Sequence, residues 1–181
     1  MFNSIMVTGQ GKRAEGERDG CLPQGIRREP GTYALIMRAQ SQVCVQVGKW
    51  GALNVTPGCY IYVGSAFGPG GVAARVGRHC RETASRYGKR LRWHIDYLRH
   101  VTRPEEVWCA YGGRELEHQW AQAFSRLDEI ASVSGFGCSD CRCDSHLFFS
   151  LRKPAPRNFS VFARTQLDIF PIQAVAMMHD R

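Results

Sequence analysis

The stretch Tyr-Ile-Tyr-Val-Gly-Ser-Ala-Phe-Gly-Pro-Gly-Gly-Val-Ala-Ala-Arg-Val-Gly-Arg-His, residues 60–79, decides the fold. It opens with an alternating run of aromatic and β-branched residues that predicts a strand. A cluster of glycines around Pro69 ends the run and predicts a loop. Val72, Val76 and Cys80 then recur every four residues, which is the apolar stripe of an amphipathic helix.

The polar side of this predicted helix points to an anion. Arg75 and His79 are four residues apart and therefore share one helical face. The glycine-rich turn at residues 68–71 leads into the helix N-terminus, where free backbone N–H groups favour a phosphate. A strand-end tyrosine, a tight turn, an arginine and a histidine are expected to converge on one anion.

Residues outside this stretch predict a small antiparallel sheet of consecutive strands. Further strands are expected at residues 31–37, 42–47, 107–111 and 146–151, and helices at 91–101 and 115–130. Residues 1–30 are polar and aperiodic, which predicts a flexible N-terminal tail. The main domain is expected to span residues 31–151, and residues 152–181 form a C-terminal extension without a clear pattern.

The charge distribution favours a polyanionic partner. The chain has a net charge of +8, and between residues 75 and 103 nine cations face only two acids, Glu82 and Asp96. Nucleic acid is the first candidate and an anionic membrane surface the second. A solvated basic face is the alternative interpretation. The predicted nucleic-acid-binding residues are Arg78, Arg81, Lys89, Arg90 and Arg92.

The sequence lacks an apolar run long enough to span a bilayer, and its first 20 residues lack the apolar core of a signal peptide. A cytoplasmic protein is therefore expected. In that reducing compartment the eight cysteines would serve as core thiols or metal ligands rather than as disulfides.

Five residues offer the groups that phosphodiester hydrolysis needs: a group to activate water, a cation for the phosphate and a carboxylate for a hard divalent metal. Taken singly, tyrosines on strands usually belong to the core, and a single helical histidine or glutamate usually lies on the surface. The five candidate catalytic residues are Tyr33, Tyr62, Arg75, His79 and Glu117.

In combination, these residues resemble the GIY-YIG nuclease superfamily. The pattern consists of Gly31-Thr32-Tyr33, Tyr62-Val63-Gly64, Arg75 with His79, and Glu117. More closely, residues 31–149 resemble an uncharacterised branch, a domain of unknown function that also occurs fused to endonuclease III. The segments that carry this closer match are residues 58–66, Arg75 with Arg78-His79, residues 92–98, Glu117 and residues 135–147.

The resemblance implies an α/β (α+β) fold, with a small, mostly antiparallel sheet of three to five strands flanked by helices. It implies a Mg²⁺-dependent or Mn²⁺-dependent endonuclease that hydrolyses DNA. Tyr33 would act as the base or orient the water, and Tyr62 would support the attack. Arg75 would hold the phosphate, His79 would assist proton movement, and Glu117 would bind Mg²⁺. The hydroxyls of both tyrosines, Arg75 and Glu117 are then expected to share one open basin.

The sequence departs from the superfamily pattern in three places. Thr32 replaces the usual isoleucine. Tyr33 and Tyr62 are separated more widely than in the pattern, which requires an extra hairpin at about residues 42–57. The late asparagine of the pattern has no clear equivalent, and Ser139 or Asp140 are the candidate substitutes.

A second group of residues is typical of a metal site. Cys138, Cys141, Cys143 and His146 offer three thiolates and an imidazole, which are ligands that Zn²⁺ prefers. Four ligands within nine residues are more crowded than in the usual structural zinc site, whose ligands come from two separated segments. A reactive thiol in a turn and simple buried cysteines are alternatives. A further possibility is that Asp140, Cys141 or His146 lines the same cleft as Tyr33.

Two rivals to the nuclease hypothesis follow. One is a nucleic-acid-binding module that keeps the fold without the chemistry. It predicts salt-dependent binding and no response to removal of Glu117. The other is a zinc or thiol module built on residues 138–146.

Overall fold

The computed structural model describes residues 23–80, 91, 93–138, 141–164 and 166–172. Its main sheet has six antiparallel strands in the order β6-β7-β4-β1-β5-β8, and β2 and β3 form a separate hairpin. The strands are β1 (Gly31–Ala39), β2 (Val43–Val47), β3 (Gly51–Val55), β4 (Gly58–Ala66), β5 (Arg103–Tyr111), β6 (Ala131–Ser132), β7 (Leu147–Ser150) and β8 (Asp168–Pro171). The helices are α1 (Gly71–Cys80), α2 (His94–Leu98), α3 (Glu115–Phe124) and α4 (Pro156–Ala163).

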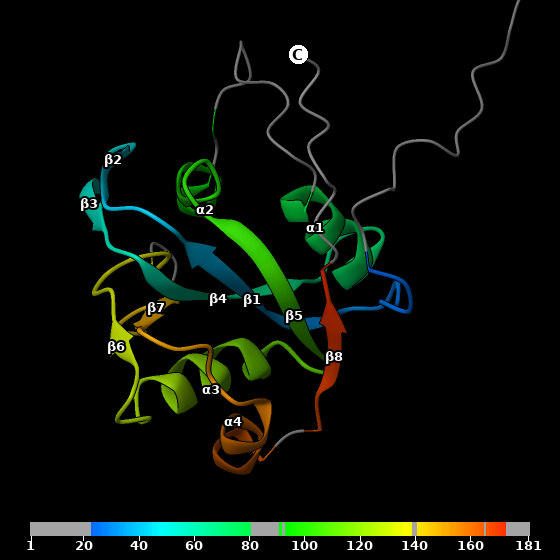
Figure 1. Ribbon diagram of the computed structural model, residues 1–181. Coiled ribbons are helices and arrows are strands. Elements are labelled where there is room, and N and C mark those ends of the chain that lie inside the picture. The colour runs from blue at the N-terminus through cyan, green and yellow to red at the C-terminus, as the bar shows by residue number, and fades with distance from the viewer. Residues whose placement is uncertain (1–22, 81–90, 92, 139–140, 165, 173–181) are drawn as a thin grey trace, which may run out of the picture.

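The predicted fold class is confirmed, and the sheet is larger than the three to five strands expected. Helices α1 and α2 lie on one side of it, and α3 and α4 lie on the other (Figure 1). Because both faces are covered, β1 is buried almost throughout, and its sequence is a continuous apolar run rather than a strict alternation.

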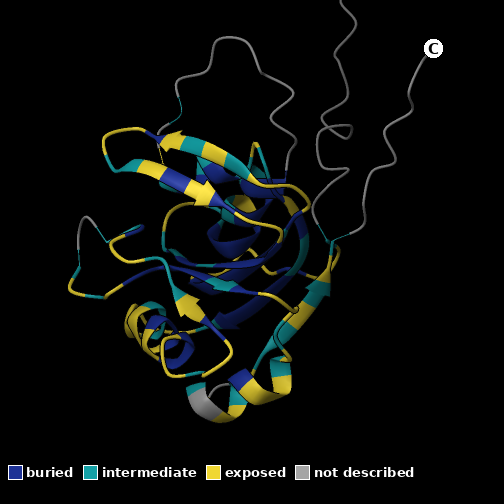
Figure 2. Ribbon diagram, turned by 60° about the vertical axis from the view of Figure 1, so that its left-hand side comes forward, coloured by how far each residue is buried: buried dark blue, intermediate teal, exposed yellow. Residues whose placement is uncertain are grey.

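Two side-chain layers fill the space between the sheet and its helices. Tyr33, Leu35 and Met37 of β1 face α1 and α2, whereas Ala34 and Ile36 face α3 and α4. In Figure 2 the buried residues, in dark blue, lie mostly in the interior of the domain, and the exposed residues, in yellow, lie mostly on the outside. The register pairs Tyr33 with Gly64 and Leu35 with Tyr62, so both tyrosines of the predicted site lie on the α1 side.

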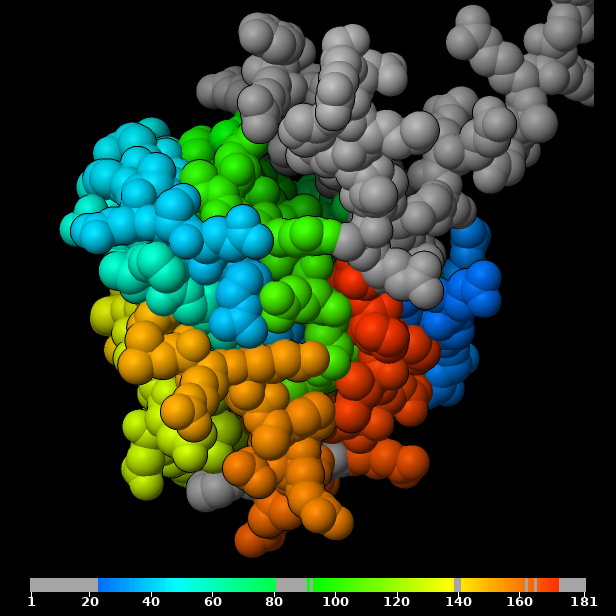
Figure 3. Space-filling view, in the orientation of Figure 1, coloured from blue at the N-terminus to red at the C-terminus, as the bar shows by residue number. Residues whose placement is uncertain are grey.

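The extra hairpin expected between the two tyrosines is confirmed as β2 and β3, which lie at the surface beside α2 (Figure 3). Among the predicted helices, α1 begins at Gly71 as expected, whereas α2 is shorter than residues 91–101. Helix α3 ends at Phe124 instead of residue 130, because the chain continues in turns whose N–H groups bond three residues back.

Parts of both predicted flanking segments belong to the folded structure. Within the N-terminal segment, Ile26 is buried in the core next to α1. Within the C-terminal segment, α4 packs on α3, and β8 pairs with β5. Among the described residues, no helix has the length and apolar character that crossing a membrane requires.

Candidate active site and metal cluster

Tyr33 lies at the centre of the candidate active site. Its hydroxyl and His79 Nε2 are 2.8 Å apart in a buried hydrogen bond that joins β1 to α1. The ring of Tyr62 lies beside both, with its centroid 6.4 Å from that of Tyr33 and 6.2 Å from that of His79. The predicted convergence of these three residues is therefore present.

Gly64 explains how Tyr33 fits against the neighbouring strand. A Cβ atom at position 64 would lie 2.6 Å from the Tyr33 hydroxyl and 2.8 Å from Cζ, well inside van der Waals contact. A residue without a side chain is therefore needed opposite Tyr33. This requirement gives the glycine of the Tyr62-Val63-Gly64 motif a packing role in the site.

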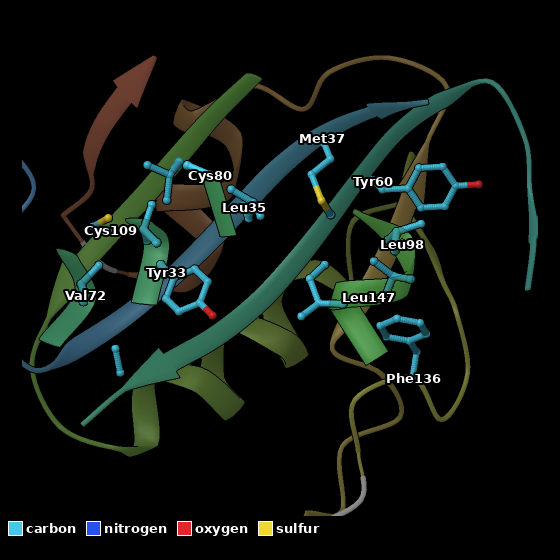
Figure 4. Close-up of a cluster of buried hydrophobic side chains, with 14 of the residues drawn as sticks. Tyr33, Leu35, Met37, Tyr60, Val72, Cys80, Leu98, Cys109, Phe136 and Leu147 are labelled. Carbon is cyan, nitrogen blue, oxygen red and sulfur yellow. The ribbon is translucent and has the colours of Figure 1, made fainter. Parts of the chain in front are cut away.

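The expectation of an open basin is wrong for Tyr33. Its side chain is only 1% exposed and lies among the apolar residues of the α1 layer (Figure 4). His79 is also buried, whereas Tyr62 and Arg75 are partly exposed. Solvent and ligands therefore reach Tyr62 and Arg75 before the Tyr33–His79 pair.

The charges around the site act on both tyrosines. Burial raises the pKa of Tyr33 well above its usual range, with a contribution from Tyr62. Burial also raises the pKa of Tyr62, and Glu117 adds to this effect. Arg75 opposes the rise in pKa for each phenol. Both phenols are therefore protonated at neutral pH, and Arg75 and Glu117 share their electrostatic environment.

His79 is neutral at physiological pH. Burial, together with the nearby guanidinium groups of Arg78, Arg75 and Arg99, lowers its pKa to about 3. Arg99 also donates a hydrogen bond of 2.8 Å from Nε to the His79 carbonyl. The neutral imidazole and the protonated Tyr33 phenol therefore share a hydrogen bond between two uncharged groups.

Glu117 reaches the site from α3, in the first helical turn, where a carboxylate interacts favourably with the helix dipole. Ser65 Oγ, on β4, donates a short hydrogen bond to Glu117 Oε2. Glu117 Oε1 lies 3.4 Å from His146 Nδ1 without hydrogen-bond geometry. The Glu117 side chain is 23% exposed, so a ligand can reach its carboxylate.

The predicted anion cradle at the start of α1 is wrong, because its donors already have partners. Val72 N–H donates to the Glu29 carbonyl at 2.9 Å, and Ala73 N–H donates to the Arg27 carbonyl at 3.1 Å. Gly71 permits this contact, since it has φ of +54° and any Cβ would lie 2.2 Å from the Glu29 oxygen. A phosphate would therefore meet side chains of α1, such as Arg75, rather than its backbone N–H groups.

The surface next to Arg75 holds an aromatic residue that was absent from the sequence-based candidates. Trp93 is 46% exposed, and the guanidinium carbons of Arg75 and Arg78 lie 5.6 and 5.7 Å from its ring centroid. Arg78 also pairs with Asp96 at 3.3 Å. Four predicted nucleic-acid-binding residues, Arg81, Lys89, Arg90 and Arg92, lie outside the described residues, as do Ser139 and Asp140.

A second cluster lies on the other side of Glu117 and can hold a metal ion. One ligand atom from each of His118, Cys141, Cys143 and His146 lies within 4.8 Å of the others. Three of these residues belong to the predicted zinc set. The fourth predicted ligand, Cys138, is replaced by His118 of α3, and its Sγ instead donates to the Phe136 carbonyl at 3.6 Å.

Close contacts join the cluster in two pairs. Cys141 Sγ lies 3.2 Å from His146 Nε2, and Cys143 Sγ lies 3.2 Å from His118 Nδ1. Burial and the neighbouring Cys141 raise the pKa of Cys143 to about 11. Burial lowers the pKa of His146, with Glu117 opposing, so the contact between His146 and Glu117 joins a neutral imidazole to a carboxylate.

The architecture and these two sites define an α+β domain with a tyrosine–histidine centre and an adjoining cysteine–histidine cluster. The model of the family Domain of unknown function DUF123 matches residues 32–167, which is most of the chain. The chain therefore belongs to this family. No curated protein and no solved structure matches it.

Proposed function

We propose that the protein is a metal-dependent endonuclease of the GIY-YIG type that acts on DNA. The observation that carries the proposal is the arrangement of Tyr62 and Arg75, both partly exposed, in front of the buried Tyr33–His79 hydrogen bond. A planar guanidinium suits a phosphate, and a neutral imidazole can hold a phenol by a hydrogen bond.

The two tyrosines differ in exposure, which suggests different catalytic roles for them. Tyr62 is the phenol that a substrate reaches, so it would orient the attacking water. Tyr33 would hold the neutral His79 ring in place through its hydroxyl. Arg75 would bind the scissile phosphate and offset the negative charge that develops there.

Glu117 is the residue that would hold the catalytic metal. Its carboxylate is partly exposed and lies close enough to both phenols to affect their pKa values. Mg²⁺ and Mn²⁺ suit such a site, because Mg²⁺ commonly takes one or two carboxylates together with phosphate oxygens and water. When bound, the ion would neutralise charge on the phosphate and on the departing oxygen.

Trp93 and its two arginines support nucleic acid as the substrate. An exposed aromatic face can stack on a base while neighbouring arginines contact phosphates. Each phosphate contact that is removed should reduce the slope of log K against log salt by about 0.9 for double-stranded DNA. Arg75→Ala and Arg78→Ala should each show this reduction, and Arg126→Ala, at an exposed position beyond α3, should not.

A cleavage assay tests the nuclease proposal. Plasmid, branched and damaged DNA would be incubated with the full chain in Mg²⁺ or Mn²⁺. Glu117→Gln and Arg75→Ala should each lower the cleavage rate by about 10²–10³-fold. Glu115→Gln is the matched control, because Glu115 is exposed in the same helical turn. Absence of cleavage of every substrate by the unaltered protein would contradict the proposal.

The burial of Tyr33 favours one alternative, a nucleic-acid-binding module without catalysis. This module would bind DNA with strong salt dependence and cleave none of the substrates. Its DNA affinity would fall in Trp93→Ala and stay the same in Glu117→Gln. Binding and cleavage measured on the same variants separate the two functions.

Two finer assignments complete the proposal. Zn²⁺ is the ion that the cysteine–histidine cluster would hold, since thiolate and imidazole are its preferred ligands. A cytoplasmic location is proposed because all seven cysteines in the described part of the chain are free thiols.

A further inference from the structure

We propose that His118, Cys141, Cys143 and His146 bind one structural Zn²⁺ ion that fixes the loop before β7 to α3 and orients Glu117. This site is separate from the proposed catalytic metal. Its existence does not depend on the nuclease function, although its effect on Glu117 matters for catalysis only if that function is correct.

The geometry of the four side chains suits zinc. Tetrahedral Zn²⁺, with bonds of about 2.3 Å to sulfur and 2.0–2.1 Å to nitrogen, places its ligand atoms about 3.3–3.8 Å apart. The two closest sulfur–nitrogen contacts are 3.2 Å, and all four ligand atoms lie within 4.8 Å of one another. Small side-chain movements would therefore complete the coordination sphere.

The positions of the ligands in the chain also suit a structural site. Cys141, Cys143 and His146 come from one loop, whereas His118 lies on α3 and precedes Cys141 by more than 20 residues. The backbone already holds the end of the loop, since Val63 N–H donates to the His146 carbonyl at 2.9 Å. An ion would add a covalent-like link between this loop and the helix.

His146 provides the connection to Glu117. Its Nε2 is the nitrogen beside Cys141 Sγ, and its Nδ1 is buried, has no hydrogen-bond partner and lies 3.4 Å from Glu117 Oε1. With Nε2 bound to zinc, the ring proton must be on Nδ1, facing the carboxylate. Zinc-binding histidines commonly donate their second N–H to a carboxylate in this way.

The first test is zinc content. Full-length protein would be purified under reducing conditions, loaded with Zn²⁺, passed through a desalting column and measured for zinc and for far-ultraviolet circular dichroism. One zinc per chain is expected. His118→Ala and Cys143→Ser should lose that zinc and keep their secondary structure, because His118 is exposed and Cys143 is partly exposed.

Cys138→Ser is the decisive control, since Cys138 is in the same loop but outside the four-ligand group. It should retain the zinc that His118→Ala loses. Loss of zinc in Cys138→Ser with retention in His118→Ala would overturn the proposed ligand set. A folded, unaltered protein that retains no zinc would overturn the site altogether.

Cobalt substitution gives a readout that does not depend on retention. Two thiolates and two imidazoles around Co²⁺ should give the visible absorption of a tetrahedral centre and a thiolate charge-transfer band. His118→Ala should lose the tetrahedral spectrum, whereas Cys138→Ser should keep it. An octahedral spectrum in the unaltered protein would contradict the assignment.

Glu117→Gln tests the link between the site and the carboxylate. It should keep one zinc at saturation but bind it about 10–100-fold more weakly in competition with a chelator, the usual effect of losing such a hydrogen-bond partner. Unchanged affinity would show that His146 does not orient Glu117. Because this measurement uses no DNA, its result is independent of whether the protein cleaves DNA.

Discussion

The two faces of the sheet differ in what they bury. The face toward α3 and α4 holds a cluster of large aromatic side chains, all fully buried: Trp108, Trp120, Phe124, Phe148 and Phe159. The face toward α1 and α2 buries phenols and an imidazole beside Phe136. There, Tyr60 bonds to Thr56 through its hydroxyl, and Tyr33 bonds to His79.

The aromatic face contributes mainly to stability, whereas the face toward α1 also carries the titratable groups of the candidate site. On the α3 and α4 side, Trp108 donates its indole N–H to Glu106, and the three phenylalanines stabilise the domain by burial alone. On the α1 side, each buried hydroxyl needs a partner, and the partner of Tyr33 is a group that can transfer protons. Substitutions on the first face should therefore affect stability alone, and substitutions on the second should also affect pH dependence.

The largest stability effect is expected on the aromatic face. The Phe124 ring stacks on Phe159 with centroids 4.0 Å apart and also contacts Trp108 and Phe148. Phe124→Ala should lower the free energy of unfolding by about 3–5 kcal/mol in urea denaturation. Val161→Ala, at a residue that is 71% exposed, is the surface control.

Val161→Ala should change stability by no more than about 0.5 kcal/mol. A loss below 1 kcal/mol for Phe124→Ala would contradict the view that this aromatic cluster stabilises the domain.

The next largest effect should appear as acid sensitivity on the polar face. The pKa of His79 is about 3 in the folded chain and 6.5 in its ordinary state, so the unfolded chain binds the extra proton between these values. Stability is therefore lost as the pH falls below 6.5, by about 2 kcal/mol at pH 5 from this residue alone. Urea denaturation at pH 7.5 and pH 5 measures the loss.

His79→Gln is the comparison for the pH experiment, because glutamine keeps polar atoms and does not titrate in this range. The variant should lose less stability between pH 7.5 and pH 5 than the unaltered protein. Equal losses in the two proteins would mean that His79 is not responsible for the acid sensitivity.

Gly64→Ala should disturb the polar face through packing. The new methyl group would overlap the Tyr33 hydroxyl, so the expected cost is about 1–3 kcal/mol in thermal or urea unfolding. Gly68→Ala, in the loop that follows β4, is the matched control, since nothing lies within 4 Å of its added Cβ. Equal stability of the two variants would contradict the close packing of Tyr33 on β4.

The smallest effect is expected for Tyr33→Phe, which removes one hydroxyl and leaves the ring in place. Loss of the hydrogen bond to His79 should cost about 1–2 kcal/mol. In the double variant with His79→Gln, the two costs should not add, because the residues share one bond. Strict additivity would show that the two side chains do not interact.

The central strands could be predicted because their residues are apolar or alternating wherever they are buried. β1 and β4 are clear in the sequence for this reason. The end of α3 was harder to predict, because Leu127 continues the apolar period and still packs on the core from a turn. Pro156, at the start of α4, was a helix signal that the sequence analysis did not use.

The candidate site was predictable only in part. The resemblance brought Tyr33, Tyr62 and His79 together, but strand alternation alone does not show that Tyr33 is buried. His118 gave no spacing signal, because it is far in sequence from Cys141 and reaches it only through the packing of α3. The crowded spacing of the four predicted ligands was the one sign that a distant residue replaces one of them.

The contact between α1 and residues 27–29 has a practical consequence for preparing the protein. A fragment cut at the bounds of the family match, residues 32–167, would remove the carbonyls that receive the first N–H groups of α1, together with Ile26 and strand β8. Expression of the domain should therefore begin before Ile26 and end after Ile172, whose N–H donates to the Glu105 carbonyl.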